Sequence, residues 1–385
     1  MKDYQLLQQK YVVNTYPDRH ITLIKGDGVY LYDQNNQKYL DMMSNYGVSI
    51  FGYNNPHINK FLRNQLKNLV VLHGSFNNNT RALASQKLIE KCKGYYAKVY
   101  WANSGTEAIE AALKFAVLAT GKKKFISCIG GYHGKTLGSL SATSGEKYKN
   151  PFEPLLWQFK QVTFGNEKEL EKAIDKDTAA FVVEPVQGES GVIVPPKDYL
   201  KKVRDICNKH NILLIIDEIQ TGAGRTGDFL ASEEVSADIL CLGKGLAGGL
   251  PVGATIVTQN IANKIPKHIH TSTFGGNPFV CAGVIKTLEI LDDRLLNQVK
   301  NLGEYFINKL KAIKSDLILQ VRGKGLIIGV EVKDKRNALL KFLQDEHVLV
   351  IPAGENVVRF LPPFIITKEN IDFTVEKFKK CVDSL

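Results

Sequence analysis

The sequence predicts an α/β protein, with a large domain built on a mostly parallel sheet and a smaller α+β domain. Short apolar runs alternate with helical periods from about residue 79 to residue 260. Such alternation is typical of a parallel sheet that helices cover on both faces. Beyond about residue 280, a long helical pattern leads into further strand patterns, which predicts a separate layer of sheet and helix.

The elements are expected in the following order. An irregular N-terminal arm precedes a hairpin whose strands, 28–33 and 38–41, flank a turn-rich loop. Strands are predicted at 98–101, 124–128, 180–184, 212–217, 239–242 and 253–257, with helices at 107–119 and 199–209 among those between them. The last layer holds strand patterns at 321–332 and 357–363, which the N-terminal hairpin could extend. We therefore divide the chain into an N-terminal arm with part of the small domain (1–48), a large domain (49–280) and a C-terminal small domain (281–385).

Composition is that of an ordinary soluble protein: 385 residues, 44% hydrophobic and 23% charged. The six cysteines, at 92, 128, 207, 241, 281 and 381, form no Cys-x-x-Cys pair. This spacing argues against a zinc site or a disulfide framework and favours a reducing compartment. We see no signal-peptide core and no apolar run near the ~18 residues of a membrane span, so a cytoplasmic protein is expected.

The net charge of +11 has two readings that the sequence leaves open. Lysines spread over a solvated surface would produce it, and so would a protein that attracts an anionic substrate or an acidic protein partner. Nucleic acid is disfavoured as a partner because the chain has no basic stripe interleaved with aromatic residues.

Lys244 has the most informative sequence context. It follows a short apolar run, has glycines at 243, 245, 248 and 249 around it, and comes 27 residues after Asp217, which ends another apolar run. An amine on a tight turn beyond one strand and a carboxylate at the end of another indicate a nucleophilic lysine. The natural partner of such an amine is an aldehyde, and the carboxylate would tune the ring that carries it.

A second pattern indicates a phosphate site. The turn Asn103-Ser-Gly-Thr-Glu follows a predicted strand and opens into strong helix formers. Free backbone N–H groups and the helix dipole at such an N-terminus attract phosphate, and Ser104 and Thr106 add hydroxyls. Plain capping of the helix by Ser or Thr is the alternative.

Two glycine-rich segments are weaker candidates. Residues 222–227 match G-x-G-x-x-G, but no helical period opens on the last glycine, so we reject a dinucleotide site. Residues 130–136 resemble a P-loop, but the required first glycine is replaced by Ile129.

Carboxylates end two of the predicted strands. Asp217 should be largely buried at the carboxyl edge of the sheet, where it needs a cationic partner unless it only caps the following loop. Glu184 ends another strand, and Glu189 follows in a glycine-containing turn; both are expected to face the same edge. For His133 and Tyr132, a local hydrogen bond and simple packing are the alternatives to a role in the site.

Together these segments resemble the fold-type I, class III (ω-) aminotransferases, which use pyridoxal phosphate, and in particular acetylornithine/ornithine aminotransferases. The matching segments occur in the same order as in that family, and they span roughly residues 12 to 370. Its segments are Asn-Ser-Gly-Thr-Glu-Ala at 103–108, Tyr-His-Gly-Lys-Thr at 132–136, Glu-Pro-Val-Gln-Gly-Glu at 184–189, Asp-Glu-Ile-Gln-Thr-Gly-Ala-Gly-Arg-Thr-Gly at 217–227, Lys244, Thr-Ser-Thr-Phe-Gly-Gly-Asn-Pro at 271–278 and Val-Arg-Phe-Leu-Pro-Pro at 358–363.

The resemblance implies a role for each matching position. Lys244 would bind the cofactor aldehyde and then move a proton, and Asp217 would keep the pyridine nitrogen protonated. Gln220 would contact the phenolic oxygen of the ring, and Thr273 would reach the cofactor phosphate of a neighbouring subunit, which implies a homodimer with shared active sites. The full implied cofactor set is Ser104, Gly105, Thr106, Tyr132, His133, Glu184, Asp217, Gln220, Lys244 and Thr273.

The implied substrate contacts are Tyr16, Tyr46, Lys135, Glu189, Ser272 and Arg359. Arg359 would bind the α-carboxylate of glutamate and 2-oxoglutarate, and Glu189 would pair with it when an ω-amine donor occupies the site. Lys135 departs from the family pattern, because acetylornithine and ornithine members usually have an arginine there. Lysine keeps the charge but loses the planar fork, which leaves a diamine such as putrescine open as donor.

We expect a terminal amino group to pass from an acetylornithine/ornithine-type donor to 2-oxoglutarate, giving glutamate and a semialdehyde. Lysine or ornithine bound to an acidic carrier protein is the nearest alternative, because a positively charged enzyme would attract that carrier. Putrescine, 4-aminobutyrate and ornithine δ-transamination stay open, as does an aminomutase. The alternative from another class is a catalytically silent relative that serves as a binding protein.

Overall fold

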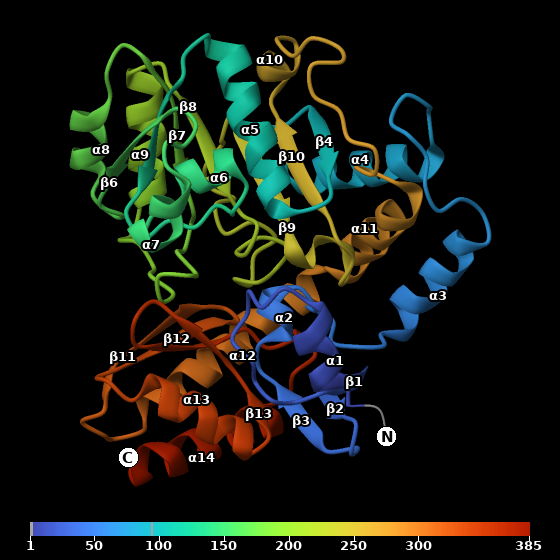
Figure 1. Ribbon diagram of the computed structural model, residues 1–385. Helices are drawn as coiled ribbons and strands as arrows, with labels where there is room; N and C mark the ends of the chain where they lie inside the picture. Colours follow the sequence, from blue (N-terminus) through green and yellow to red (C-terminus); the bar gives the residue numbers. More distant parts are fainter. Residues whose placement is uncertain (1–2, 94) are drawn as a thin grey trace.

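The computed structural model describes residues 3–93 and 95–385. A large part is built on a seven-stranded sheet, and a smaller part contains both ends of the described chain (Figure 1). The prediction of an α/β fold with a mostly parallel sheet is confirmed.

The large sheet has the strand order β4 (Lys98–Ala102), β10 (Gly253–Val257), β9 (Ile239–Gly243), β8 (Leu213–Asp217), β7 (Thr178–Val183), β5 (Lys124–Cys128) and β6 (Gln158–Val162). β10 runs antiparallel to both β4 and β9, whereas the pairs from β9 to β6 are parallel. The carboxyl ends of the six strands other than β10 therefore meet at one edge. The sequence analysis missed β6, because this edge strand alternates exposed and partly buried residues and has no apolar run.

Helices cover the two faces of this sheet. Alternate residues of its central strands pack with α5 (Gly105–Thr120): Ala180, Val182, Ile215, Ile239 and Cys241. The intervening residues belong to the larger core that includes α9 (Tyr199–Lys209): Phe181, Val183, Leu214, Ile216, Leu240 and Leu242. This burial on both faces explains the continuous apolar runs in the sequence.

The smaller part joins the two ends of the chain. The N-terminal sheet consists of β1 (Leu23–Asp27), β2 (Tyr30–Asp33) and β3 (Lys38–Asp41), and β3 pairs in parallel with β13 (Val348–Leu349). A second, antiparallel sheet has the order β11 (Ile318–Lys324), β12 (Ile327–Val332), β15 (Val357–Phe360) and β14 (Ile351–Ala353). The N-terminal hairpin thus adds to the C-terminal layer.

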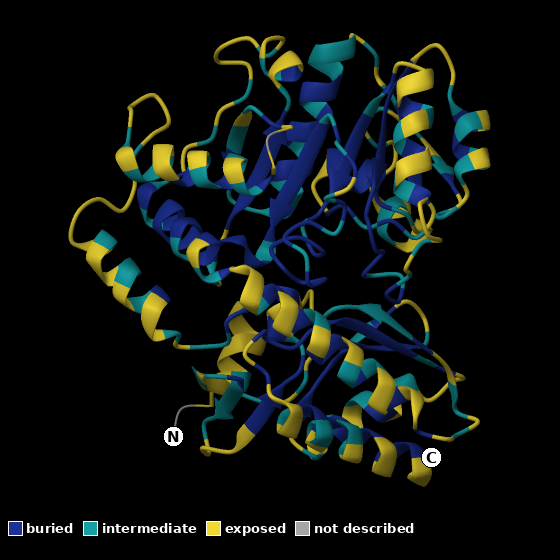
Figure 2. Ribbon diagram, turned by 180° about the vertical axis from the view of Figure 1, so that it is seen from behind, coloured by how far each residue is buried: buried dark blue, intermediate teal, exposed yellow. Residues whose placement is uncertain are grey.

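The remaining elements are helical. The pattern beyond residue 280 is two helices, α11 (Pro278–Ile290) and α12 (Asp293–Lys311), because Asp292 caps the start of the second. The others are α1 (Tyr4–Tyr11), α2 (Ser44–Gly47), α3 (Pro56–Leu66), α4 (Asn79–Lys91), α6 (Leu137–Ala142), α7 (Glu146–Lys149), η1 (Asn150–Phe152), α8 (Glu167–Ala173), η2 (Lys244–Ala247), α10 (Gln259–Ala262), α13 (Arg336–Asp345) and α14 (Lys368–Ser384). None of the described helices is long and apolar enough to cross a membrane. Buried residues fill the large sheet and the loops between the two parts (Figure 2).

Candidate active site

A pocket of about 160 Å³ lies at the carboxyl edge of the large sheet. Its lining comes from the ends of β7, β8 and β9, the start of α5 and the loop after β5: Gly105, Thr106, Tyr132, His133, Glu184, Glu189, Asp217, Ile219, Gln220 and Lys244. The sequence analysis named every one of these except Ile219. The pocket therefore brings together segments that lie up to about 140 residues apart, as ligand sites in open α/β sheets do.

Lys244 is the first residue after β9 and begins the short helix η2 with a positive φ of 43°. Burial lowers the pKa of its amine to about 8, with the nearby Arg359 cation acting in the same direction and Glu189 and Asp217 opposing them. A substantial fraction of this amine is therefore neutral near physiological pH. Neutral lysine is the form that attacks an aldehyde.

Asp217 and His133 form a buried pair. His133 Nδ1 lies 2.7 Å from Asp217 Oδ2, and the backbone N–H of Ile219 donates to Asp217 Oδ1 at 3.0 Å. Burial opposes a charge on the ring, but the hydrogen bond to Asp217 and its charge outweigh burial and raise the pKa of His133. Asp217 thus does cap the following loop, as one alternative predicted, and it also has His133 as a basic neighbour.

Glu184 lies directly after β7 and is also buried. Its Oε1 accepts the backbone N–H of Tyr132 at 3.0 Å, which fixes the loop that carries Tyr132 and His133. Burial raises the pKa of Glu184 to about 7, although the charge of His133 opposes this effect. Burial also raises the pKa of Tyr132 to about 12, so its ring stays neutral where it lines the pocket.

The predicted phosphate turn lies at the N-terminus of the 16-residue helix α5. Ser104 is the N-cap residue, and its hydroxyl accepts the backbone N–H of Glu107 at 3.3 Å, so capping is what the Ser104 side chain does. Gly105 and Thr106 line the pocket itself. A Cβ on Gly105 would lie 2.7 Å from a side-chain atom of Ile219, so the first turn of the helix can approach the pocket only with glycine here.

The side chain of Arg359 reaches the same pocket lining from the other part of the molecule, where it belongs to β15. It is fully buried; its Nη2 lies 2.8 Å from Glu189 Oε1, and its Nη1 donates to Gln220 Oε1 at 3.2 Å. The Nη2 and Nε atoms make no aligned hydrogen bond. Burial raises the pKa of Glu189, but the cations Arg359 and Lys244 outweigh burial and bring it below the ordinary value. The guanidinium thus keeps donors available for a carboxylate.

Tyr46, Lys135 and Tyr16 lie around this pocket without lining it. The ring centroid of Tyr46 is 5.8 Å from the guanidinium carbon of Arg359. Lys135 is exposed, with its Nζ 5.4 Å from the ring centroid of Tyr148, and its charge helps to lower the pKa of Glu189. Tyr16 is 81% exposed.

The other two predicted residues lie outside the pocket of the single chain. Ser272 Oγ accepts hydrogen bonds from Asn103 Nδ2 at 3.2 Å and from the N–H of Gly275 at 2.9 Å, so it fixes its own loop beside the start of α5. Thr273 is exposed. Neither residue is among those that line the pocket.

The residues present fit pyridoxal phosphate. A buried amine of lowered pKa can bind its aldehyde, the buried carboxylate of Asp217 can pair with a ring nitrogen, and the start of α5 presents backbone N–H groups to a phosphate. Ile219 is the lining residue that sequence reasoning missed. A signal was present, since it follows Asp217 by two residues, but its apolar side chain carries no chemistry that singles it out.

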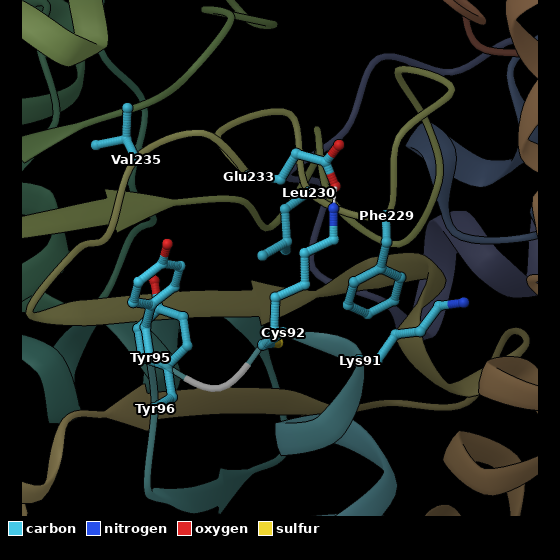
Figure 3. Close-up of a pocket in the computed structure, with 9 residues that line it drawn as sticks. Lys91, Cys92, Tyr95, Tyr96, Phe229, Leu230, Glu233 and Val235 are labelled. Atoms are coloured by element: carbon cyan, nitrogen blue, oxygen red, sulfur yellow. Dashed lines mark hydrogen bonds and ion pairs between the residues drawn. The ribbon is translucent and has the colours of Figure 1, made fainter.

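A second, much smaller cavity lies elsewhere, beside the end of α4 (Figure 3). It has about 10 Å³, room for roughly one water molecule. Among its lining residues, Lys93 Nζ lies 2.8 Å from Glu233 Oε2, and Figure 3 labels Glu233. Burial raises the pKa of the Cys92 thiol to about 12, so this cysteine stays protonated and unreactive.

Comparisons with known proteins agree with this geometry. The sequence model of the family described as aminotransferase class-III matches residues 11–382. The acetylornithine aminotransferase of Methanopyrus kandleri is 40% identical over 375 residues, which cover 96% of each chain. The [LysW]-aminoadipate semialdehyde/glutamate semialdehyde transaminase of Sulfolobus acidocaldarius is 40% identical and covers 94% of each chain. The solved ornithine aminotransferase of Toxoplasma gondii superimposes with a TM-score of 0.95 at 32% identity, covering 99% of this chain and 94% of its own.

Proposed function

Because the chain belongs to the class III aminotransferases, which depend on pyridoxal phosphate, we propose that it moves a terminal amino group from an acetylornithine- or ornithine-type donor to 2-oxoglutarate. The products are glutamate and a semialdehyde. The family and the cofactor were both expected from the sequence. The donor and the acceptor are the proposal.

The observation that carries the proposal is the pair formed by Arg359 and Glu189 within reach of Lys244. A fully buried guanidinium that lies 2.8 Å from a partly exposed carboxylate is a cation whose counter-ion can be exchanged. When glutamate or 2-oxoglutarate enters, its α-carboxylate replaces Glu189 on Arg359, and when a terminal amine enters, Glu189 returns. One pocket can then accept two substrates of different charge.

Each residue of the pocket has its own role in the transfer of the amino group. Bound pyridoxal phosphate supplies an aldehyde for the amino group and a ring that accepts electrons from the adjacent carbon. Lys244 Nζ would take the proton from the carbon that bears the donor's amino group and deliver it to the carbon that was the cofactor's aldehyde. Asp217, which lies beside His133, would pair with a protonated ring nitrogen, and Gln220 would contact the phenolic oxygen. Gly105 and Thr106 would hold the phosphate.

We also propose a homodimer with shared active sites. Thr273 is exposed beside the exposed ring of Phe274, and a further group of exposed apolar side chains lies in the segment before α4: Leu69, Val70, Val71 and Phe76. A second copy that covers these side chains would remove apolar surface from water and bring Thr273 to the neighbouring phosphate.

The nearest alternative donor is an amino acid bound to an acidic carrier protein. The 40% identical relative from Sulfolobus acidocaldarius has a LysW-linked substrate in its name, and the net charge of +11 would attract an acidic carrier. Putrescine remains a candidate because Lys135 lacks the planar fork of arginine, and 4-aminobutyrate and ornithine δ-transamination also stay open.

A donor panel with 2-oxoglutarate tests the proposal. The donors are acetylornithine, ornithine, lysine, putrescine, 4-aminobutyrate and an acidic carrier loaded with lysine, each assayed by glutamate formation at low and high salt. We expect acetylornithine or ornithine to have the highest kcat/KM. A strong preference for putrescine would overturn our choice of donor, and salt sensitivity confined to the loaded carrier would favour the carrier-bound alternative. Turnover without 2-oxoglutarate would indicate an aminomutase.

A separate measurement distinguishes an enzyme from a silent binding protein. Purified protein with bound cofactor should have a visible absorption band, and Lys244→Ala should abolish it. A wild-type protein without such a band would refute the enzyme reading.

A further inference from the structure

The segment that carries Tyr46 has an unusual backbone. Four consecutive residues, Ser44 to Gly47, have positive φ angles of 40°, 50°, 59° and 87°. This is a left-handed turn, and each residue other than glycine costs free energy in that conformation because its Cβ crowds the following carbonyl. Three such residues in succession persist only where the surroundings hold them.

Asp41 holds the start of this turn. Its carboxylate is fully buried at the end of β3. Oδ1 accepts the backbone N–H groups of Met43 at 2.9 Å and Ser44 at 3.0 Å, while Oδ2 accepts the hydroxyl of Tyr53 at 2.7 Å. Two of the N–H groups that enter the turn are therefore fixed on one carboxylate oxygen.

Arg225 holds the turn from the other side. Its buried Nη2 donates to Ser44 Oγ at 3.2 Å, and Ser44 Oγ in turn donates to the carbonyl of Leu361 at 2.5 Å. Nη1 donates to the carbonyls of Leu326 at 3.0 Å and Pro362 at 2.6 Å, so this one guanidinium joins the turn to the C-terminal sheet. Burial lowers the pKa of Arg225 to about 9, and the charge of Asp41 opposes that effect, so the guanidinium stays mostly charged at neutral pH.

This arrangement connects the glycine-rich segment 222–227 to the loop that carries Tyr46. The segment matches G-x-G-x-x-G, but its arginine faces the loop that carries Tyr46. Gly224, which precedes it, has a φ of 89°, and a Cβ there would lie 2.9 Å from a side-chain atom of Leu296. The glycine therefore permits the tight turn that buries Arg225.

We propose that Asp41 and Arg225 are positioning residues, which hold the left-handed turn so that the Tyr46 ring covers Arg359 and thereby sets the preference between carboxylate-bearing and terminal-amine substrates. The ring centroid lies 5.8 Å from the guanidinium carbon, within the range of a cation–π contact. A ring in this place restricts Arg359 to the orientation in which it pairs with a carboxylate. This inference rests on the proposed function, in which Arg359 binds the substrate carboxylate.

A double-mutant cycle tests whether Asp41 acts through Tyr46. The variants are Asp41→Asn, Tyr46→Leu and the two combined, and the quantity measured is the ratio of kcat/KM for glutamate to kcat/KM for ornithine. We expect Asp41→Asn to change this ratio roughly fivefold or more in the wild-type background, and less than about twofold in the Tyr46→Leu background. The exposed Asp27→Asn on β1 is the matched control and should leave the ratio unchanged.

The outcomes separate the two ideas. Additive effects of Asp41→Asn and Tyr46→Leu would overturn the positioning role, because Asp41 would then act by another route. A ratio that Tyr46→Leu leaves unchanged would overturn the part of the proposal in which the Tyr46 ring sets the substrate preference. Ser44→Ala, which removes the hydroxyl that joins Arg225 to the turn, replaces Asp41→Asn in the cycle if the latter does not fold.

A readout that needs no substrate completes the test. In protein labelled with 3-fluorotyrosine, the Tyr46 ¹⁹F resonance is assigned by its absence from Tyr46→Phe. Asp41→Asn should shift or broaden this resonance, and Asp27→Asn should not. An unchanged Tyr46 resonance in Asp41→Asn would refute the positioning role whatever the substrate proves to be.

Discussion

Replacing Glu189 by glutamine separates the two half-reactions that the pocket is proposed to perform. In the structure, Glu189 Oε1 lies 2.8 Å from Arg359 Nη2. The carboxylate competes with any substrate carboxylate for this guanidinium. Glu189→Gln keeps the shape of the side chain and removes its charge, so Arg359 should bind 2-oxoglutarate more tightly. The half-reaction with a terminal amine should become slower, because Arg359 then has no counter-ion.

The size of the effect follows from burial. Breaking a fully buried pair costs about 3–5 kcal/mol. The side chain of Glu189 is 31% exposed, whereas that of Arg359 is fully buried, so solvent screening reduces the value. We expect about 1–2 kcal/mol, which corresponds to roughly 5- to 30-fold tighter binding of 2-oxoglutarate and a fall of similar size in the donor half-reaction. The free energy of unfolding should drop by about the same amount, because a buried cation is left uncompensated.

The assay follows each half-reaction alone by stopped-flow absorbance of the cofactor. The aldehyde form is mixed with the donor, and the aminated form is mixed with 2-oxoglutarate. Glu376→Gln, an exposed position on α14, is the matched control and should change neither rate. If Glu189→Gln weakened 2-oxoglutarate binding, or slowed both half-reactions equally, the idea of an exchangeable counter-ion would be wrong.

Four further predictions concern Lys244, the left-handed turn and the proposed shared site. In cofactor-free protein, the rate at which Lys244 condenses with an aldehyde should rise tenfold per pH unit up to about pH 8 and then level off. A rate that kept rising up to pH 10.5 would contradict the lowered pKa of Lys244. The free energy of unfolding should increase between pH 8 and 10.5, because in that range the unfolded chain binds a proton that the folded chain does not. In thermal unfolding, Asn45→Gly should leave the free energy of unfolding nearly unchanged, whereas Asn45→Val should lower it by roughly 1–2 kcal/mol, because valine is strained at a φ of 50°. Equal effects of the two substitutions would argue against the left-handed turn. Finally, Lys244→Ala and Thr273→Ala should each be nearly inactive, yet mixed and refolded together they should regain activity at one intact site per mixed dimer; no recovery would count against a shared site.

Much of the pocket was accessible from the sequence because its residues follow strands. Apolar runs at 213–217 and 239–243 are buried on both faces of a parallel sheet, so they are easy to recognise, and the residue that ends each run must lie at the carboxyl edge. This placed Asp217 and Lys244 near each other, although 27 positions separate them. Edge strand β6 was not predicted, because only one of its five residues is buried and its hydrophobicity pattern resembles that of a solvated segment.

The sequence by itself therefore determined the fold class, the family and most of the pocket lining, since these depend on hydrophobic periodicity and on ordered motifs. Only the tertiary structure decided how the two parts of the molecule meet. It paired Arg359 with Gln220, brought His133 to Asp217, and placed the Ser104 hydroxyl as the cap of α5. The pair of Arg359 with Glu189 was already implied by the family resemblance, and the structure added its distance of 2.8 Å. It also fixed Tyr46 in a left-handed turn held by Asp41 and Arg225. These contacts join residues far apart in the chain, and a buried charge finds its partner only when packing removes water from both, which local sequence does not encode.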